Sequence, residues 1–140
     1  MENDPLPNSD HIARYCPPGK CDESGNPSGT AFMLRPNERF LSVDWLEILH
    51  PTSRGTQIDR LRTALSRRLA VRKTAKIAVL WISSTCDYVL NNTGDRRQLE
   101  VRHHPYDDDP SHSGIHNIRD DDSLIADLIA QLIEEVHSST

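Results

Sequence analysis

One segment of the chain, residues 103–116, concentrates the side chains that are best able to do chemistry. It contains four of the seven histidines and three consecutive aspartates. Imidazole is the only side chain that titrates near neutral pH without perturbation, and it is also the commonest metal ligand. This segment is therefore the first place where we expect a site.

The segment suits two kinds of chemistry. Neutral imidazoles from His112 and His116, together with the Asp109 carboxylate, would suit Zn²⁺ or another divalent metal. His103 and His112 with Asp108 could instead act as general acid and base on a phosphodiester. The alternative is a solvated polar loop that leads into the next helix, since composition alone is a weak argument for a site.

Two of the three cysteines form a second candidate site. Cys16 and Cys21 are separated by four residues, a spacing that could supply half of a zinc site if histidines completed it. Two ordinary thiols are the alternative. An odd number of cysteines does not suit a secreted disulfide framework, so we expect reduced thiols in a cytosol.

Basic residues are unevenly distributed, although the net charge is −5. Residues 54–76 hold eight basic residues, among them Arg67 and Arg68, against a single acidic one. Such a face can dock an acidic protein partner. Nucleic acid is the less favoured partner, because the pI is about 5.7 and aromatic residues make up only 5%. Arg14 and Arg35 lie beside predicted strands and could converge on a binding pocket.

The hydrophobic pattern indicates which elements hold these residues. Short apolar segments predict strands at 12–16, 31–34, 40–43, 77–82 and 99–103, with 88–90 extending or pairing with the fourth. Apolar residues spaced three and four apart predict helices over about 56–73 and 122–137. Asp44 is expected to cap a short helix that stops by His50, because Pro51 disfavours helical geometry in the residue before it.

This order of elements predicts one α+β domain over residues 11–140. It would contain a small mixed or antiparallel sheet, with the two main helices packed on one face. Residues 1–10 are polar and rich in Asn and Pro, so they are predicted to be a disordered lead.

No stretch of the chain approaches the roughly 18 apolar residues of a membrane span. The first residues also lack the basic and apolar regions of a signal peptide, so we expect a cytoplasmic protein without a membrane partner. The sequence contains no Walker loop, dinucleotide-binding motif, nucleophile elbow or zinc-protease motif.

Three phrases in the first third of the chain carry a resemblance. They are Asp-His-Ile-Ala-Arg-Tyr-Cys-Pro at 10–17, Ala-Phe-Met-Leu-Arg-Pro at 31–36 and Leu-Ser-Val-Asp-Trp-Leu-Glu at 41–47. Together they resemble a small uncharacterised family of bacterial proteins. The resemblance implies a bacterial source and no activity, and it assigns no site residue.

Two functional hypotheses follow from the sequence. The first is an interaction module that docks a partner protein through its basic helix or a sheet edge. The alternative is a small His/Asp-dependent hydrolase, metal-assisted or not, with a phosphodiester as its substrate. The lack of a complete catalytic motif favours the first hypothesis, and the density of titratable groups at 103–116 favours the second.

Overall fold

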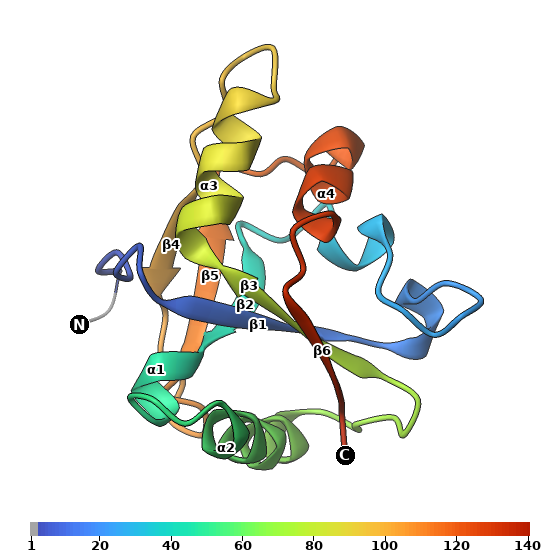
Figure 1. Ribbon diagram of the computed structural model, residues 1–140, viewed down its shortest axis with the longest axis vertical. Coiled ribbons are helices and arrows are strands. Elements are labelled where there is room, and N and C mark those ends of the chain that lie inside the picture. Colours follow the sequence, from blue (N-terminus) through green and yellow to red (C-terminus); the bar gives the residue numbers. More distant parts are fainter. Residues whose placement is uncertain (1–2) are drawn as a thin grey trace.

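The fold is built on one antiparallel sheet (Figure 1). It is seen in a computed structural model that describes residues 3–140. These residues form six strands in the order β4-β5-β2-β1-β3-β6. The strands are β1 His11–Cys16, β2 Leu41–Trp45, β3 Lys76–Trp81, β4 Glu100–His103, β5 His112–His116 and β6 Glu135–Ser138. The helices are α1 Leu46–Leu49, α2 Arg54–Arg68, α3 Ile82–Asn91 and α4 Ser123–Ala130, with 3-10 turns η1 Pro18–Lys20 and η2 Gly29–Phe32. The predicted α+β class is confirmed.

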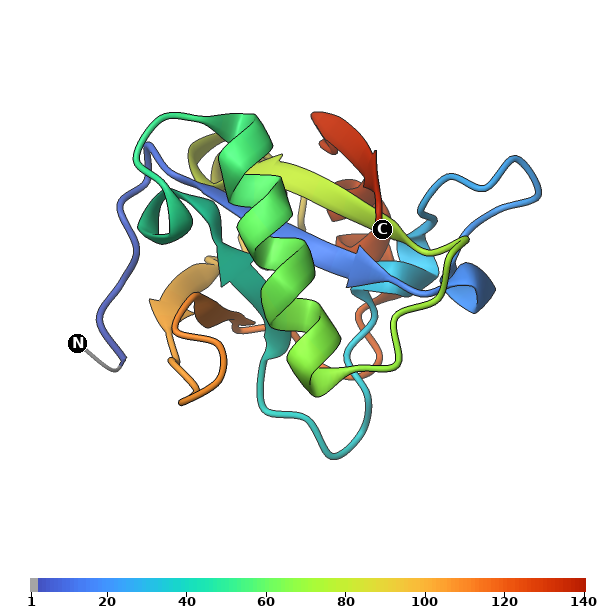
Figure 2. The same ribbon diagram turned by 90° about the horizontal axis from the view of Figure 1, so that it is seen from below.

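Helices cover both faces of the sheet, whereas the sequence predicted one covered face (Figures 1 and 2). Helix α2 packs its Ile58 and Leu61 against Ile77 and other small or branched residues of β1 and β3. The larger core lies on the opposite face, where α3, α4 and η2 meet around Phe32. Two layers of helix are needed because the interior strand β3, between β1 and β6, is apolar on both faces, with residues 77–80 fully buried.

Residues 3–140 contain four α-helices rather than two main ones. The helix predicted over 122–137 ends at Ala130, and the chain continues as β6. Val136 of β6 pairs with Ala78 of β3, so this segment supplies hydrogen bonds to a strand edge that would otherwise lack them. The helix predicted over 56–73 runs from Arg54 to Arg68. Its N-cap is Ser53, whose side chain accepts a hydrogen bond from the Thr56 amide.

Three other predicted elements have a different form. The segment around 88–90 belongs to helix α3, which buries Ile82, Thr85 and Val89 at spacings of three and four residues. The strand predicted at 31–34 is replaced by the turn η2. Asp44 does not cap α1, because it lies within β2 and its carboxylate is buried among other polar groups.

The predicted disordered lead packs along the edge of β4 from residue 3 onward, and residues 1–2 lie outside the described residues. The Asn3 amide donates to the His103 carbonyl oxygen, and the Leu6 amide donates to that of Val101. The Leu6 side chain is buried in the larger core. Ordering this segment costs conformational entropy, and its polar composition predicted too few contacts to offset that cost. The hydrogen bonds and the buried Leu6 side chain supply those contacts.

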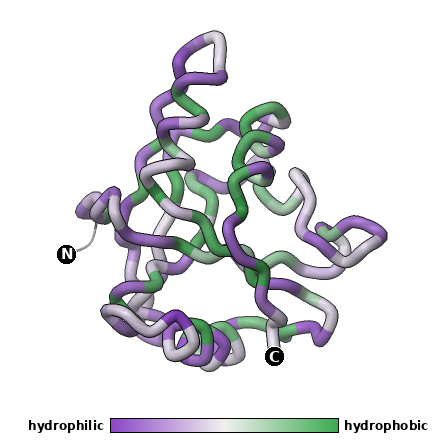
Figure 3. The backbone as a smooth tube through the Cα atoms, in the orientation of Figure 1, coloured by the Kyte–Doolittle hydropathy of each residue, from purple (hydrophilic) through white to green (hydrophobic). Residues whose placement is uncertain are grey.

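The distribution of hydropathy follows these layers. In Figure 3, α4 is mostly hydrophobic, whereas α2 alternates hydrophilic and hydrophobic residues. Within residues 3–140, every helix is too short or too polar to cross a membrane.

Candidate functional site

The segment with the histidines and aspartates is a β-hairpin. Strands β4 and β5 pair antiparallel, and Tyr106 and Asp109 close the turn through reciprocal main-chain hydrogen bonds of 3.0 and 3.2 Å. Asp108 is exposed at the tip of this turn. The predicted loop is therefore an extension of the sheet, in which His103, His112 and His116 occupy strand positions and His104 directly follows β4.

The hairpin separates the predicted acid–base residues His103, His112 and Asp108. Successive side chains of a strand point to opposite faces. His103 pairs with Ser113 and so faces away from His112. Its Nε2 lies 2.7 Å from the Pro110 carbonyl oxygen. The structure does not bring these three residues together.

The predicted metal ligands are also dispersed. His112 and His116 share one face of β5, but the Phe40 ring lies between them over Gly114. The ring is so close that a Cβ added to Gly114 would come within 2.2 Å of its Cδ1 atom. His116 instead meets His104, with 2.7 Å between the two Nε2 atoms.

Asp109, the third predicted ligand, turns toward α2 instead. Its Oδ2 lies 3.1 Å from Nη2 of Arg68, at an angle that does not make a hydrogen bond. Cys16 and Cys21 are both free thiols. Among residues 3–140, no group of three or more His, Cys, Asp or Glu side chains could hold a metal ion.

A pair of buried carboxylates lies under the C-terminal end of α2. Asp44 and Asp109 both contact Ser111, whose Oγ is 2.8 Å from Oδ1 of Asp44 and 2.6 Å from Oδ1 of Asp109. One hydroxyl has one proton to donate, so the second contact requires a protonated carboxyl group as its donor. The pair therefore holds one proton of its own.

The surroundings place that proton on Asp44. Burial raises the pKa of Asp44 well above its ordinary value, and the Asp109 carboxylate beside it raises that pKa further. Burial would also raise the pKa of Asp109, but hydrogen bonds from Asp44 and Ser111 and the charge of Arg68 outweigh it and lower that pKa. Asp44 is accordingly the member of the pair that holds its proton more tightly, and Asp109 is the member that ionises first and balances Arg68.

Asp44 also forms part of the wall of a pocket. The cavity has a volume of about 240 Å³ and lies between the C-terminal end of α2, β1, and the loop that precedes β2, which meet in Figure 2. Its lining combines four cations with few acidic groups: Arg14, Tyr15, Pro17, Lys20, Arg35, Glu38, Ser42, Asp44, Leu65, Arg68 and Leu69. Arg14 and Arg35, which the sequence singled out, thus line the same pocket.

Arg14 fills the space where β1 and β2 separate. Their pairing ends at Ala13 and Asp44. Beyond this point the Arg14 guanidinium donates from Nε to the Ala31 carbonyl oxygen at 2.9 Å and from Nη1 to that of Ser42 at 2.7 Å. Burial lowers the pKa of Arg14, which means that its charge is poorly solvated.

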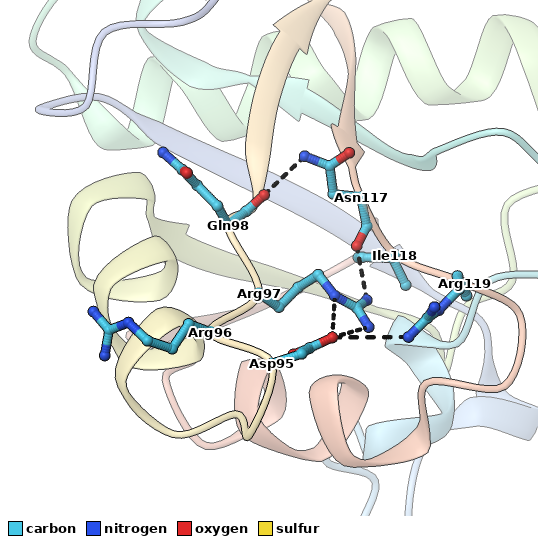
Figure 4. A pocket seen from close by; sticks show the side chains of 7 residues that line it. All are labelled: Asp95, Arg96, Arg97, Gln98, Asn117, Ile118 and Arg119. Atoms are coloured by element: carbon cyan, nitrogen blue, oxygen red, sulfur yellow. Dashed lines mark hydrogen bonds and ion pairs between the residues drawn. The ribbon is translucent and has the colours of Figure 1, made fainter.

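A second hollow lies between the loop that precedes β4 and the loop that follows β5, and its central arginine is already paired. Figure 4 shows Arg97 at its centre. Arg97 donates to Asp95 at 2.8 Å, to the Asn117 carbonyl oxygen at 2.9 Å and to Asp122 at 2.5 Å. This network ties the loop before β4 to the start of α4. Arg97 has its full set of partners, and the other two arginines of the lining, Arg96 and Arg119, are exposed, so we do not assign a ligand to this hollow.

Sequence reasoning missed four residues of the site: Lys20, Ser42, Asp44 and Ser111. A signal for two of them is present in β2, because the polar residues 42 and 44 alternate with the apolar residues 41 and 43. This period places both side chains on one face of a strand. Ser111 has no such signal, since its role depends on the hairpin that carries it to Asp44.

The comparisons with known proteins do not extend this description. No protein-family model, curated protein or solved structure matches the chain.

Proposed function

We propose that this protein binds a small molecule carrying a carboxylate or phosphate group in the pocket beneath the end of α2. The observation that carries the proposal is the environment of Arg14. Among residues 3–140 it forms no ion pair, and its hydrogen bonds go to neutral carbonyl oxygens. Arg14 is half-buried, and the Glu38 carboxylate of the same pocket acts on it without forming an ion pair. A poorly solvated cation without an ion-pair partner is costly, and an anionic ligand would supply a direct counter-charge.

The other cations of the pocket support the same proposal. Arg35, which is exposed, and Lys20, which is half-buried, both line the pocket. Arg68 is already paired with Asp109, so it contributes less free charge than the other three. Planar guanidinium groups suit bidentate recognition of carboxylate and phosphate.

The proposal is tested by titrating inorganic phosphate and succinate into the protein while recording amide chemical shifts. We expect saturable shifts at residues of the pocket. Arg35→Ala should raise the Kd about tenfold or more, because a hydrogen bond to a charged group contributes about 1.5–3 kcal/mol. Arg39→Ala is the matched control, since Arg39 is exposed on the same loop and does not line the pocket. Equal effects of the two substitutions, or no saturable shift with either anion, would contradict the proposal.

Docking of a protein partner, the first hypothesis from the sequence, stays a prediction. Its proposed surface would now contain Arg67 without Arg68, because Arg67 is exposed and Arg68 is turned toward Asp109. A cytoplasmic location is likewise proposed, supported by the three free cysteines.

A further inference from the structure

The hydroxyl of Ser42, on the wall of the pocket, lies beside a histidine that is held as an acceptor. Ser42 Oγ is 3.2 Å from Nε2 of His112. The other ring nitrogen, Nδ1, lies 2.7 Å from the main-chain carbonyl oxygen of His104. A carbonyl oxygen only accepts, so Nδ1 carries the proton. The neutral ring then presents the lone pair of Nε2 to the Ser42 hydroxyl.

The sheet and the hairpin hold this geometry in place. Asp44 pairs with His112 and Ser42 pairs with Gly114, so Ser42 and His112 are diagonal neighbours on one face. The Tyr106 ring stacks on the imidazole with 3.8 Å between the centroids and 14° between the planes. The His112 side chain is buried, with 1% of its surface exposed. The imidazole is therefore preorganised toward the hydroxyl.

The charges around His112 keep it neutral. Arg68 of α2, Asp44 of β2 and His104 and Asp109 of the hairpin surround it. Burial is the main cause that lowers its pKa, and the charges of Arg68 and His104 lower it further. These effects outweigh the hydrogen bond to the His104 carbonyl oxygen and the charge of Asp109, which both raise the pKa. A neutral imidazole at pH 7 is the form that can accept a proton.

We propose that Ser42 is a nucleophile and His112 its general base, in the hydrolysis of a carboxylic ester that carries an anionic group. This inference rests on the proposed function, because the cations of the pocket hold that anionic group while the ester meets Ser42. Enzymes of several unrelated folds carry out acyl transfer with the same arrangement. In it, the nucleophile is hydrogen-bonded to a base, and a third group orients that base. His112 was a predicted acid–base residue, and its partner here is Ser42 rather than His103 or Asp108.

The reaction balances with water as the only co-reactant. His112 Nε2 takes the Ser42 proton as Oγ bonds to the acyl carbon, and the bond from that carbon to the alcohol oxygen breaks. The imidazolium returns the proton to the departing alkoxide, which leaves as the alcohol. Water then gives a proton to His112 while its oxygen attacks the acyl-serine. The bond from Oγ to the acyl carbon breaks, Ser42 regains its proton and the carboxylic acid is released.

The first experiment treats the full chain with a fluorophosphonate probe and maps the adduct by mass spectrometry. Attack by Ser42 forms an Oγ–P bond and expels fluoride. We expect the adduct on Ser42 and its loss in Ser42→Ala. His112→Gln should slow labelling by about 100-fold or more, the usual contribution of a general base. Ser66→Ala, at an exposed serine of α2, is the control and should label at the original rate.

The second experiment separates this inference from the proposed function. Wild type should hydrolyse 4-nitrophenyl succinate faster than the uncharged 4-nitrophenyl butyrate. Arg35→Ala should reduce this rate ratio about tenfold and should still react with the fluorophosphonate probe. Ser42→Ala should keep the phosphate-induced shifts and lose hydrolysis. Saturable anion binding without labelling or hydrolysis would overturn the role of Ser42 alone. Labelling of Ser42 without anion binding or ester preference would overturn the anionic substrate and the proposed function.

Discussion

At the scale of single residues, Arg67 and Arg68 are neighbours on α2 with opposite surroundings. Arg67 is exposed, whereas 19% of the Arg68 side chain is exposed and its partner Asp109 is fully buried. Removing one partner of a buried pair leaves an uncompensated charge. We therefore expect Arg68→Glu to lower the free energy of unfolding by about 3–5 kcal/mol. Arg67→Glu should change it by about 0.5 kcal/mol or less.

Urea denaturation of the two variants measures this difference. The same denaturation midpoint for both would show that the contact between Arg68 and Asp109 does not contribute to stability. The sequence placed both arginines in one basic face that could dock a partner. It could not separate them, because the carboxylate that Arg68 meets lies on a hairpin 41 residues further along the chain.

The same limit applies to the rest of the site. Residue type and flanking strands were enough to select Arg14 and Arg35, which line one pocket. They were not enough to select Ser42 as the partner of His112, because that contact depends on the register of β2 against β5. The register is the pairing of residues between two neighbouring strands, and it is defined only once those strands lie side by side. The sequence did not show that β2 and β5 are neighbours.

At the scale of elements, helix α4 tests whether the larger core is packed as described. Leu128 is 7% exposed and Leu124 is 59% exposed on the same helix. Leu128→Ala should lower the free energy of unfolding by about 2–5 kcal/mol, because it empties a buried leucine site. Leu124→Ala is the matched control and should cost about 0.5 kcal/mol or less. If denaturant unfolding gave the two variants similar stabilities, α4 would not be docked through Leu128.

The end of α4 also shows why some elements could be predicted and others not. The periodicity of three and four residues identified α2, and the apolar run identified β3, since each pattern fits one structure. Leu132, Ile133 and Val136 extend the helical pattern of α4 beyond Ala130, yet they belong to the turn and to β6. Pairing with the open edge of β3 decides their structure, and that edge exists only in the folded sheet.

At the scale of the whole molecule, two histidines with lowered pKa values link stability to pH. The pKa of His112 is lowered by burial and by the charge of Arg68. The pKa of His116 is lowered by burial and, to a smaller extent, by the charge of His104. The unfolded chain binds protons at these positions near pH 6.5, where the folded protein does not. Stability rises with pH wherever the unfolded state binds more protons. Acidification below about pH 6.5 should therefore destabilise the fold.

A second loss should follow at lower pH. Burial alone would raise the pKa values of Asp109 and Asp122, but hydrogen bonds from Asp44 and Arg97, among others, outweigh it and lower both. Their stabilisation is present above the ordinary pKa near 4 and is lost as the pH falls through their folded values. Asp44 acts in the opposite sense. Its raised pKa costs stability above about pH 4, and that cost disappears on acidification, which softens the second loss.

Thermal unfolding between about pH 8 and pH 3 separates the two stages. For the wild type we expect the Tm to fall below about pH 6.5 and again below about pH 4. A variant with both His112→Gln and His116→Gln should lose the first decline, because glutamine does not titrate, and keep the second, because Asp109 and Asp122 are unchanged. A wild-type Tm that stays constant down to about pH 5 would show that neither imidazole is held neutral by the fold.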